Sequence, residues 1–314
     1  MKLSFFFLSF FIVFLFVISC VSQTDVPLGS PTENAETSDE TLLTVPSSDL
    51  PAYTGDLYLI DTHAHILPKD KEKNDAFLAS LVVAAENAGV SKIMLGLHAR
   101  QVPDREPTYS EDHDVWVLAA YEQYPDVIVP MLAGFDPADP DAVSYVEEQL
   151  KTGVWKGIGE LDLRNSVKKT TTQMNDPTMM EIYKLAATYA VPVMVHYDFC
   201  YETDCDSGKD EFEEALAENP DTIFILAHGC QVELMKAYEN LYCETAMATS
   251  QLPDTTILDR VMLGTDVQHP DLNVQKTASY EEFIAMLRET IETLDAEDAE
   301  KIAHGTAEEI FHLS

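Results

Sequence analysis

Short apolar runs alternate with amphipathic stretches along the chain from about residue 56 to its end. Runs this short and this apolar are typical of parallel strands that are buried on both faces. They occupy residues 57–60, 92–97, 127–133, 154–159, 191–195, 222–227, 240–243 and 260–264. Because strands that alternate with helices form βα units, the pattern predicts a right-handedly wound parallel sheet.

The stretches between the runs have helical periodicity and include residues 75–88, 114–123, 141–150, 179–189, 211–218 and 232–238. Eight βα units in about 260 residues predict a (β/α)₈ TIM barrel. A doubly wound open sheet is the competing architecture, but no Gly-x-Gly-x-x-Gly loop follows the first run. Residues 280–313 are helical and longer than an eighth barrel helix, which predicts an extra C-terminal helix. Thr306 and Glu309 have the spacing of a capping box that would start it.

The chain begins with a segment that does not belong to this fold. Lys2 precedes an apolar run over residues 3–19, and small residues follow, which is typical of a secretory signal. The position of Cys20 resembles a lipobox, in which the cysteine is lipidated. We therefore expect a lipoprotein-type signal peptide over residues 1–20 and a membrane-anchored, extracytoplasmic protein. Simple secretion or an uncleaved N-terminal transmembrane anchor are the alternatives.

Residues 21–55 contain no Lys or Arg and are rich in Ser, Thr, Pro, Asp and Glu. Such a stretch buries too little apolar surface to offset its ordering entropy, so we expect a disordered acidic tether. The remaining residues, 56–314, form the predicted barrel domain. The whole chain is strongly acidic, with a net charge of −36 at pH 7. This charge argues against a nucleic-acid partner.

Four histidines and two carboxylates follow five of the predicted strands. They are His63 and His65, Glu160, His196, His228 and Asp266. Each residue alone is typical of a structural hydrogen bond or a turn. In a parallel barrel, however, the carboxyl ends of all strands converge around one mouth. The set therefore indicates a metal site.

With these residues on the strands, the chain resembles the amidohydrolase superfamily, in its amidohydrolase-related branch of TIM-barrel metal-dependent hydrolases. The resemblance covers residues 57–313. It includes Tyr-Pro-Asp at 124–126, Gly-Phe-Asp-Pro at 134–137 and Lys-Ile-Ala-His-Gly-Thr-Ala at 301–307. Thr306 stands where relatives often have Asn.

The resemblance implies that His63, His65 and Asp266 bind a first metal and that His196 is a further ligand. Glu160 occupies the place of a bridging carboxylate. One or two divalent ions are implied, and the nitrogen-rich ligand set favours zinc.

Two residues have implied catalytic roles. Asp266 would take a proton from metal-activated water, and His228 would either complete a second metal site or polarise the substrate. This chemistry suits cleavage of an amide, ester, lactone or phosphoester bond, and we expect an amide, ester or lactone of a small molecule as substrate. Arg100 and Arg164 are candidates for holding an anionic substrate, although an ion pair on an acidic protein is an equal explanation for each.

Three alternatives remain at this point. Some relatives in the same branch are metal-dependent decarboxylases. A TatD-like nuclease shares the barrel, but its last strand carries Glu-Thr-Asp where this chain has Gly264-Thr265-Asp266, and the net charge repels DNA. A tethered binding protein would hold a ligand through the metal without turnover.

The cysteines suggest disulfides outside the cytoplasm. Cys200 and Cys205 lie close enough in sequence for a local pair. Cys230 and Cys243 could pair or remain buried thiols, because sequence does not fix connectivity.

Overall fold

The structure, a computed structural model, describes residues 49–66, 71–97, 114–201, 204, 206–246, 255–268 and 279–313. The predicted signal peptide, Cys20, most of the tether, Arg100 and Cys205 lie outside these residues and stay predictions. Among the helices that the structure describes, none combines the length and the apolarity needed to cross a bilayer.

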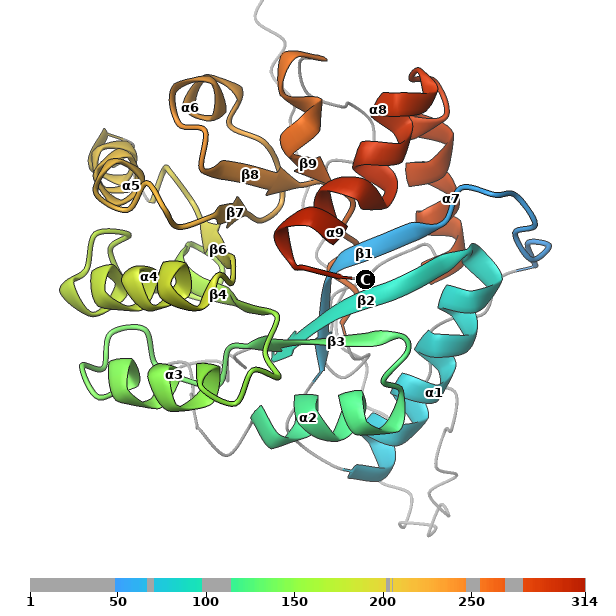
Figure 1. Cartoon of the computed structure of the whole chain (residues 1–314), viewed down its shortest axis with the longest axis horizontal. Coiled ribbons are helices and arrows are strands. Elements are labelled where there is room, and N and C mark those ends of the chain that lie inside the picture. The colour runs from blue at the N-terminus through green and yellow to red at the C-terminus, as the bar shows by residue number, and fades with distance from the viewer. Residues whose placement is uncertain are drawn as a thin grey trace, which may run out of the picture. The chain divides into compact units, whose positions relative to one another are not determined.

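Eight parallel strands form a ring in chain order, with each strand paired to the next (Figure 1). They are β1 (Leu59–Ile66), β2 (Val90–Leu97), β3 (Ile128–Leu132), β4 (Gly157–Asn165), β6 (Val193–Tyr197), β7 (Phe224–Leu226), β8 (Leu241–Glu244) and β9 (Val261–Met262). The short β5 (Thr170–Thr171) pairs antiparallel with the end of β4. Each apolar run of the sequence overlaps one of the eight parallel strands.

The ring closes between the segment that follows β9 and the first strand. Thr62 N donates to Leu263 O at 2.9 Å, and His65 N donates to Val267 O at 2.8 Å. The carboxylate of Asp61 strengthens this seam, because it accepts from Thr265 Oγ1 at 2.7 Å and from Tyr280 OH at 3.0 Å. The predicted TIM barrel is confirmed.

Helices lie around the ring of strands (Figure 1). They are α1 (Lys71–Ala88), α2 (Asp114–Gln123), α3 (Ala142–Leu150), α4 (Pro177–Tyr189), α5 (Asp206–Glu218), α6 (Val232–Ala237), the 3₁₀ helix η3 (Thr255–Arg260) and α7 (Tyr280–Ile291). The larger apolar core lies between the strands and these helices. Burial of side chains on both faces explains why the strand sequences are almost continuously apolar.

The C-terminal segment closes the amino-terminal end of the barrel. It consists of α8 (Ala296–Glu300), the π-helical η5 (Lys301–Gly305) and α9 (Thr306–Ile310). Ile310 and Phe311 pack with Ile60 of β1, Met94 of β2 and Met262 of β9. Figure 1 shows α9 and the C-terminus at the middle of the ring. This apolar plug leaves the opposite end of the barrel for chemistry.

The predicted capping box at Thr306 is wrong. Gly305 has helical backbone angles and Thr306 makes no capping hydrogen bond, because η5 runs directly into α9. The Thr306 hydroxyl instead donates to Asp259 O at 3.2 Å. A capping box does occur at Ser279 and Glu282, where it starts α7.

Candidate metal centre

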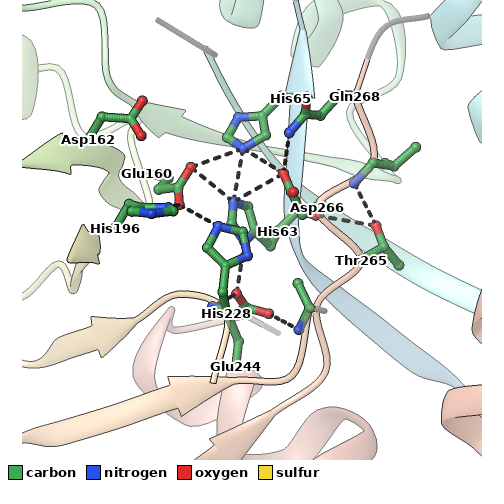
Figure 2. A network of polar contacts seen from close by, with 12 residues as sticks. His63, His65, Glu160, Asp162, His196, His228, Glu244, Thr265, Asp266 and Gln268 are labelled. Carbon is green, nitrogen blue, oxygen red and sulfur yellow. Dashed lines mark hydrogen bonds and ion pairs between the residues drawn. The ribbon is translucent and has the colours of Figure 1, made fainter. Parts of the chain in front are cut away.

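The six predicted ligands converge at the carboxyl-terminal mouth of the barrel (Figure 2). His63 and His65 lie in β1, and Glu160 lies in β4. The other three are His196 in β6, His228 after β7 and Asp266 after β9. Five separate strand ends therefore supply one cluster, as the convergence of strands in a closed barrel requires.

One part of the cluster surrounds the two histidines of β1. The Nε2 atoms of His63 and His65 lie 2.9 Å apart. Oδ1 of Asp266 lies 3.8 Å from the first and 3.3 Å from the second. Oε2 of Glu160 lies 3.4 and 3.3 Å from the same two nitrogens. Two imidazole nitrogens and two carboxylate oxygens thus face a common point.

A second part of the cluster lies on the other oxygen of Glu160. Oε1 of Glu160 lies 3.0 Å from His228 Nε2 and 3.2 Å from His196 Nδ1. The side chains of His196 and His228 are about one-fifth exposed, whereas those of His63, His65 and Glu160 are almost fully buried. A small molecule would therefore approach over His196 and His228.

These residues fit a divalent cation. Imidazole nitrogens mixed with carboxylate oxygens are the ligands that zinc and similar first-row ions prefer. Three overlapping triads each bring one ligand atom per residue within 4.8 Å: His63, Glu160 and His228; His63, His65 and Asp266; and Glu160, Asp162 and His196. Within the described part of the chain, the Nδ1 atom of His228 is buried without a hydrogen-bond partner.

The electrostatics of the cluster favour charged groups despite burial. Burial alone would lower the pKa of His63, but the charges of Glu160 and Glu244 raise it well above its usual value. Burial alone would raise the pKa of Glu160, but His63, His196 and His228 hold it well below its usual range. The pKa of Asp266 is likewise lowered, because His65 and His63 outweigh its burial. The carboxylates are therefore ionised and ready to bind a cation.

Two of the predicted ligands have unusual backbone conformations. His228 and Asp266 have φ values of 63° and 50°, in the left-handed region that residues other than glycine rarely adopt. Such conformations persist where the surrounding structure enforces them, and they concentrate at functional sites. Gly159, with φ 113°, precedes Glu160; a Cβ atom there would collide with Met194 O. This glycine therefore permits the close approach of β4 and β6 beside the ligand.

Sequence reasoning missed two acidic residues beside the cluster. Glu244 ends β8 and is fully buried; the predicted strand stopped one residue before it. Asp162 lies two residues after Glu160, still within β4. It was missed because β4 extends to Asn165, six residues beyond the predicted run. Its carboxylate contacts Lys168 Nζ at 2.5 Å and Asn165 Nδ2 at 2.9 Å. The period-two spacing of Glu160 and Asp162 along one strand is the signal that could have found it.

Arg164 lies outside the cluster of ligands. Its guanidinium donates to Asp204 O at 2.9 Å and lies 3.7 Å from Glu211. It also lies over the rings of Tyr197 and Tyr201, with its Cζ 5.9 and 5.8 Å from their centres. These contacts fasten the loop between β6 and α5, and a role of Arg164 in substrate binding stays a prediction.

The structure pairs Cys230 with Cys243 in a disulfide, with a Cα–Cα distance of 5.2 Å. This outcome resolves the two alternatives that the sequence left for these residues. The bond joins the loop that follows His228 to the residue that precedes Glu244. Cys200 is also disulfide-bonded, whereas Cys205, its expected partner, lies outside the described residues.

Comparison with known proteins agrees with this geometry. A family model described as Amidohydrolase matches residues 60–313, and no curated protein matches the sequence. The chain is similar to an uncharacterized TIM-barrel protein from Bordetella bronchiseptica, at 18% identity and a TM-score of 0.58, over 82% of this chain and 99% of that chain.

Two further solved structures represent different reactions. A 5-carboxyvanillate decarboxylase from Novosphingobium aromaticivorans, with bound manganese, is 13% identical with a TM-score of 0.53, over 84% of this chain and 100% of that chain. A probable 2-pyrone-4,6-dicarboxylic acid hydrolase from Acinetobacter baumannii is 14% identical with a TM-score of 0.55, over 81% of this chain and 99% of that chain. At these identities the likeness shows the fold alone.

Proposed function

The chain belongs to the amidohydrolase family, and from that premise we propose that it is a metal-dependent hydrolase that cleaves an amide, ester or lactone bond of a small molecule. One observation carries the choice of hydrolysis. Glu160 turns one carboxylate oxygen to His63 and His65 and the other to His196 and His228. A carboxylate shared in this way suits a pair of ions, and paired ions are common in hydrolytic sites.

The residues divide into binding and proton-transfer roles. His63, His65 and Asp266 would hold one ion, while His196 and His228 would hold a second across Glu160. The nitrogen-rich set supports zinc. A divalent ion in this place supplies Lewis acidity that activates water and polarises a carbonyl.

Asp266 would transfer the proton during the reaction. Its carboxylate is ionised, and Gln268 Nε2 donates to its Oδ1 at 2.7 Å, which fixes its orientation. The other oxygen, Oδ2, could accept a proton from the attacking water and return it to the leaving group. If only one ion is bound, His228, on the exposed side of the cluster, could instead stabilise the oxyanion that develops.

The experiment is a metal-dependent turnover assay with simple amide, ester and lactone substrates, on wild type and on Asp266→Asn. We expect turnover that chelation abolishes, that added zinc restores and that the variant lacks. Turnover that survives both chelation and Asp266→Asn would overturn the proposal. Metal binding with no turnover of any substrate class would support the tethered binding protein instead.

Decarboxylation is the second candidate. The observation in its favour is the likeness to the manganese-containing 5-carboxyvanillate decarboxylase. Carbon dioxide release from hydroxylated aromatic acids, measured beside the hydrolysis assays, separates the two reactions. Carbon dioxide release that Asp266→Asn abolishes would show that the site catalyses a lyase reaction instead of hydrolysis.

We also propose that the barrel is tethered to a membrane, outside the cytoplasm, through a lipid on Cys20. This follows from the charged and apolar pattern of residues 1–20. Wild type labelled with a fatty-acid analogue should fractionate with membranes, and Cys20→Ala should lose the label. An unlabelled wild type would leave secretion or a transmembrane anchor.

A further inference from the structure

The carboxylate of Glu244 is the most completely enclosed acidic group at the mouth, with no exposed surface. Its Oε1 accepts from the backbone N–H of His228 at 2.7 Å and lies 2.9 Å from Nδ1 of His63. Its Oε2 accepts from the backbone N–H of Ala246 at 2.5 Å. A buried carboxylate with three donors is a built feature, because burying the charge without them would be costly.

These contacts fix which nitrogen of His63 carries the proton. An ionised carboxylate can only accept hydrogen bonds, so Nδ1 of His63 is the donor. In the neutral imidazole that binds a metal, the lone pair is then on Nε2, the nitrogen that faces His65, Glu160 and Asp266. This is the nitrogen that a metal at the β1 histidines would require.

The same carboxylate also holds the second half of the cluster. The backbone of His228 has a left-handed conformation, with φ 63°, which is unfavourable for an isolated histidine. Its N–H is tied to Glu244, and its Nε2 lies 3.0 Å from Glu160. Glu244 therefore contacts one ligand from each side of Glu160.

Space for this carboxylate is provided by a glycine in the segment that follows β9. A Cβ atom on Gly264 would collide with Oε2 of Glu244 and would lie 3.0 Å from Cβ of His63. Glycine at 264 thus admits the carboxylate. Its replacement by alanine would displace Glu244 without removing it.

We propose that Glu244 is a positioning residue that orients His63 and His228 as metal ligands. It acts through these two residues and touches neither substrate nor metal. The inference rests on the proposed function to the extent that His63 binds a metal. Carboxylates that accept from a ligating imidazole typically contribute about 10–100-fold to metal affinity.

The test compares Glu244→Gln with Asp114→Asn. Asp114 is a matched control outside the cluster, because it is also buried and accepts from two backbone N–H groups and one side chain, those of Ala133, Gly134 and Tyr145. The measurements are the Co²⁺ dissociation constant and the visible absorption of the Co²⁺-loaded protein. Glutamine keeps the size of the side chain but turns an amide donor toward one of the N–H groups.

We expect Co²⁺ affinity to fall by about 10–100-fold in Glu244→Gln, with an altered visible spectrum, and to be unchanged in Asp114→Asn. Unchanged affinity and spectrum in Glu244→Gln would overturn the inference while leaving the proposed function intact. Equal losses in both variants would also overturn it, because they would indicate a general effect of a lost buried carboxylate. A wild type that binds no Co²⁺ would overturn the proposed function itself.

Gly264→Ala gives an independent measurement if Glu244→Gln does not fold. We expect this variant to bind Co²⁺ more weakly than wild type, with a shifted spectrum, because its methyl group moves the Glu244 carboxylate. Wild-type affinity and spectrum in a folded Gly264→Ala protein would overturn the inference.

Discussion

Oε1 of Glu160 lies 3.0 Å from Nε2 of His228, while the other oxygen of the same carboxylate faces the histidines of β1. One side chain thus touches both halves of the cluster. Glu160 comes from β4 and His228 follows β7, so the contact passes over β6, the strand that lies between them. Occupancy of the two halves by metal should therefore depend on a single residue.

Glu160→Gln is expected to lose metal. Wild type should hold two divalent ions per chain after dialysis against buffer without metal, and the variant should hold one at most. The reason is that a neutral amide cannot supply one anionic oxygen to each half. Elemental analysis by mass spectrometry measures the ratio.

Glu211→Gln is the control, because Glu211 is buried beside Tyr197 and outside the ligand cluster. It should keep the metal content of wild type. One ion in wild type that Glu160→Gln leaves in place would contradict a shared carboxylate.

Much of this cluster could be predicted from the sequence because its ligands follow apolar runs. His196 and His228 come directly after such a run and His63 comes three residues after one, and their convergence follows from barrel geometry alone. Glu244 and Asp162 were missed, because an apolar pattern locates a strand but not its last residue, and only the period-two spacing after Glu160 points to Asp162. Glu244 was assigned to no strand end, and Asp162 lies in a strand that continues through polar residues.

Local motifs and pairings were harder to predict for a different reason. The Thr306 capping box has the correct spacing, but packing of Ile310 and Phe311 against the barrel end is compatible with one continuous helical segment. Tertiary packing overrides such local signals. The pairing of Cys230 with Cys243 depends on β7 and β8 being neighbours, which only the folded barrel establishes.

Arg164→Met is expected to lower the free energy of unfolding and to change KM little. The substitution leaves Glu211 buried without its guanidinium partner, and breaking a buried pair on one side costs about 3 kcal/mol. Urea unfolding measures the free energy, and steady-state kinetics on an anionic and a neutral substrate measures KM. A KM rise confined to the anionic substrate, at unchanged stability, would instead support the substrate-binding role predicted from the sequence.

Asp114 should make stability depend on pH in the mildly acidic range. Burial raises the pKa of this carboxyl from 3.8 to about 6, although Tyr145, Ala133 and Gly134 donate to it. The folded state therefore binds more protons than the unfolded state between these values, so this contribution is fully present below about pH 4 and is lost as pH rises to about 6. At about 1.4 kcal/mol per pKa unit, the loss is about 3 kcal/mol.

The measurement is the difference in unfolding free energy between wild type and Asp114→Asn from pH 4 to pH 7. Other titrating groups cancel in this difference, since asparagine removes only one of them. The unfolding free energy of wild type minus that of Asp114→Asn should fall as pH rises and should level off above about pH 6. A difference that stays constant or increases as pH rises would contradict a raised pKa of Asp114.

Removal of the disulfide should affect the site as well as the fold, because its cysteines lie beside the candidate ligand His228 and beside Glu244, the residue proposed to position it. Cys230 is two residues after His228, and Cys243 immediately precedes Glu244. The bond spans 13 residues, and closing a loop of that size contributes about 3 kcal/mol through the unfolded state. The double variant Cys230→Ala, Cys243→Ala should therefore melt about 6–12 °C lower than wild type.

The double variant should also bind Co²⁺ more weakly, since the His228 backbone and Glu244 lose a covalent constraint. In reductant, wild type and the double variant should melt close to each other, because the bond of Cys200 is then broken in both. Equal melting temperatures for oxidised wild type and the double variant would show that the bond contributes nothing to stability, and unchanged Co²⁺ affinity would separate the disulfide from the positioning of the ligands.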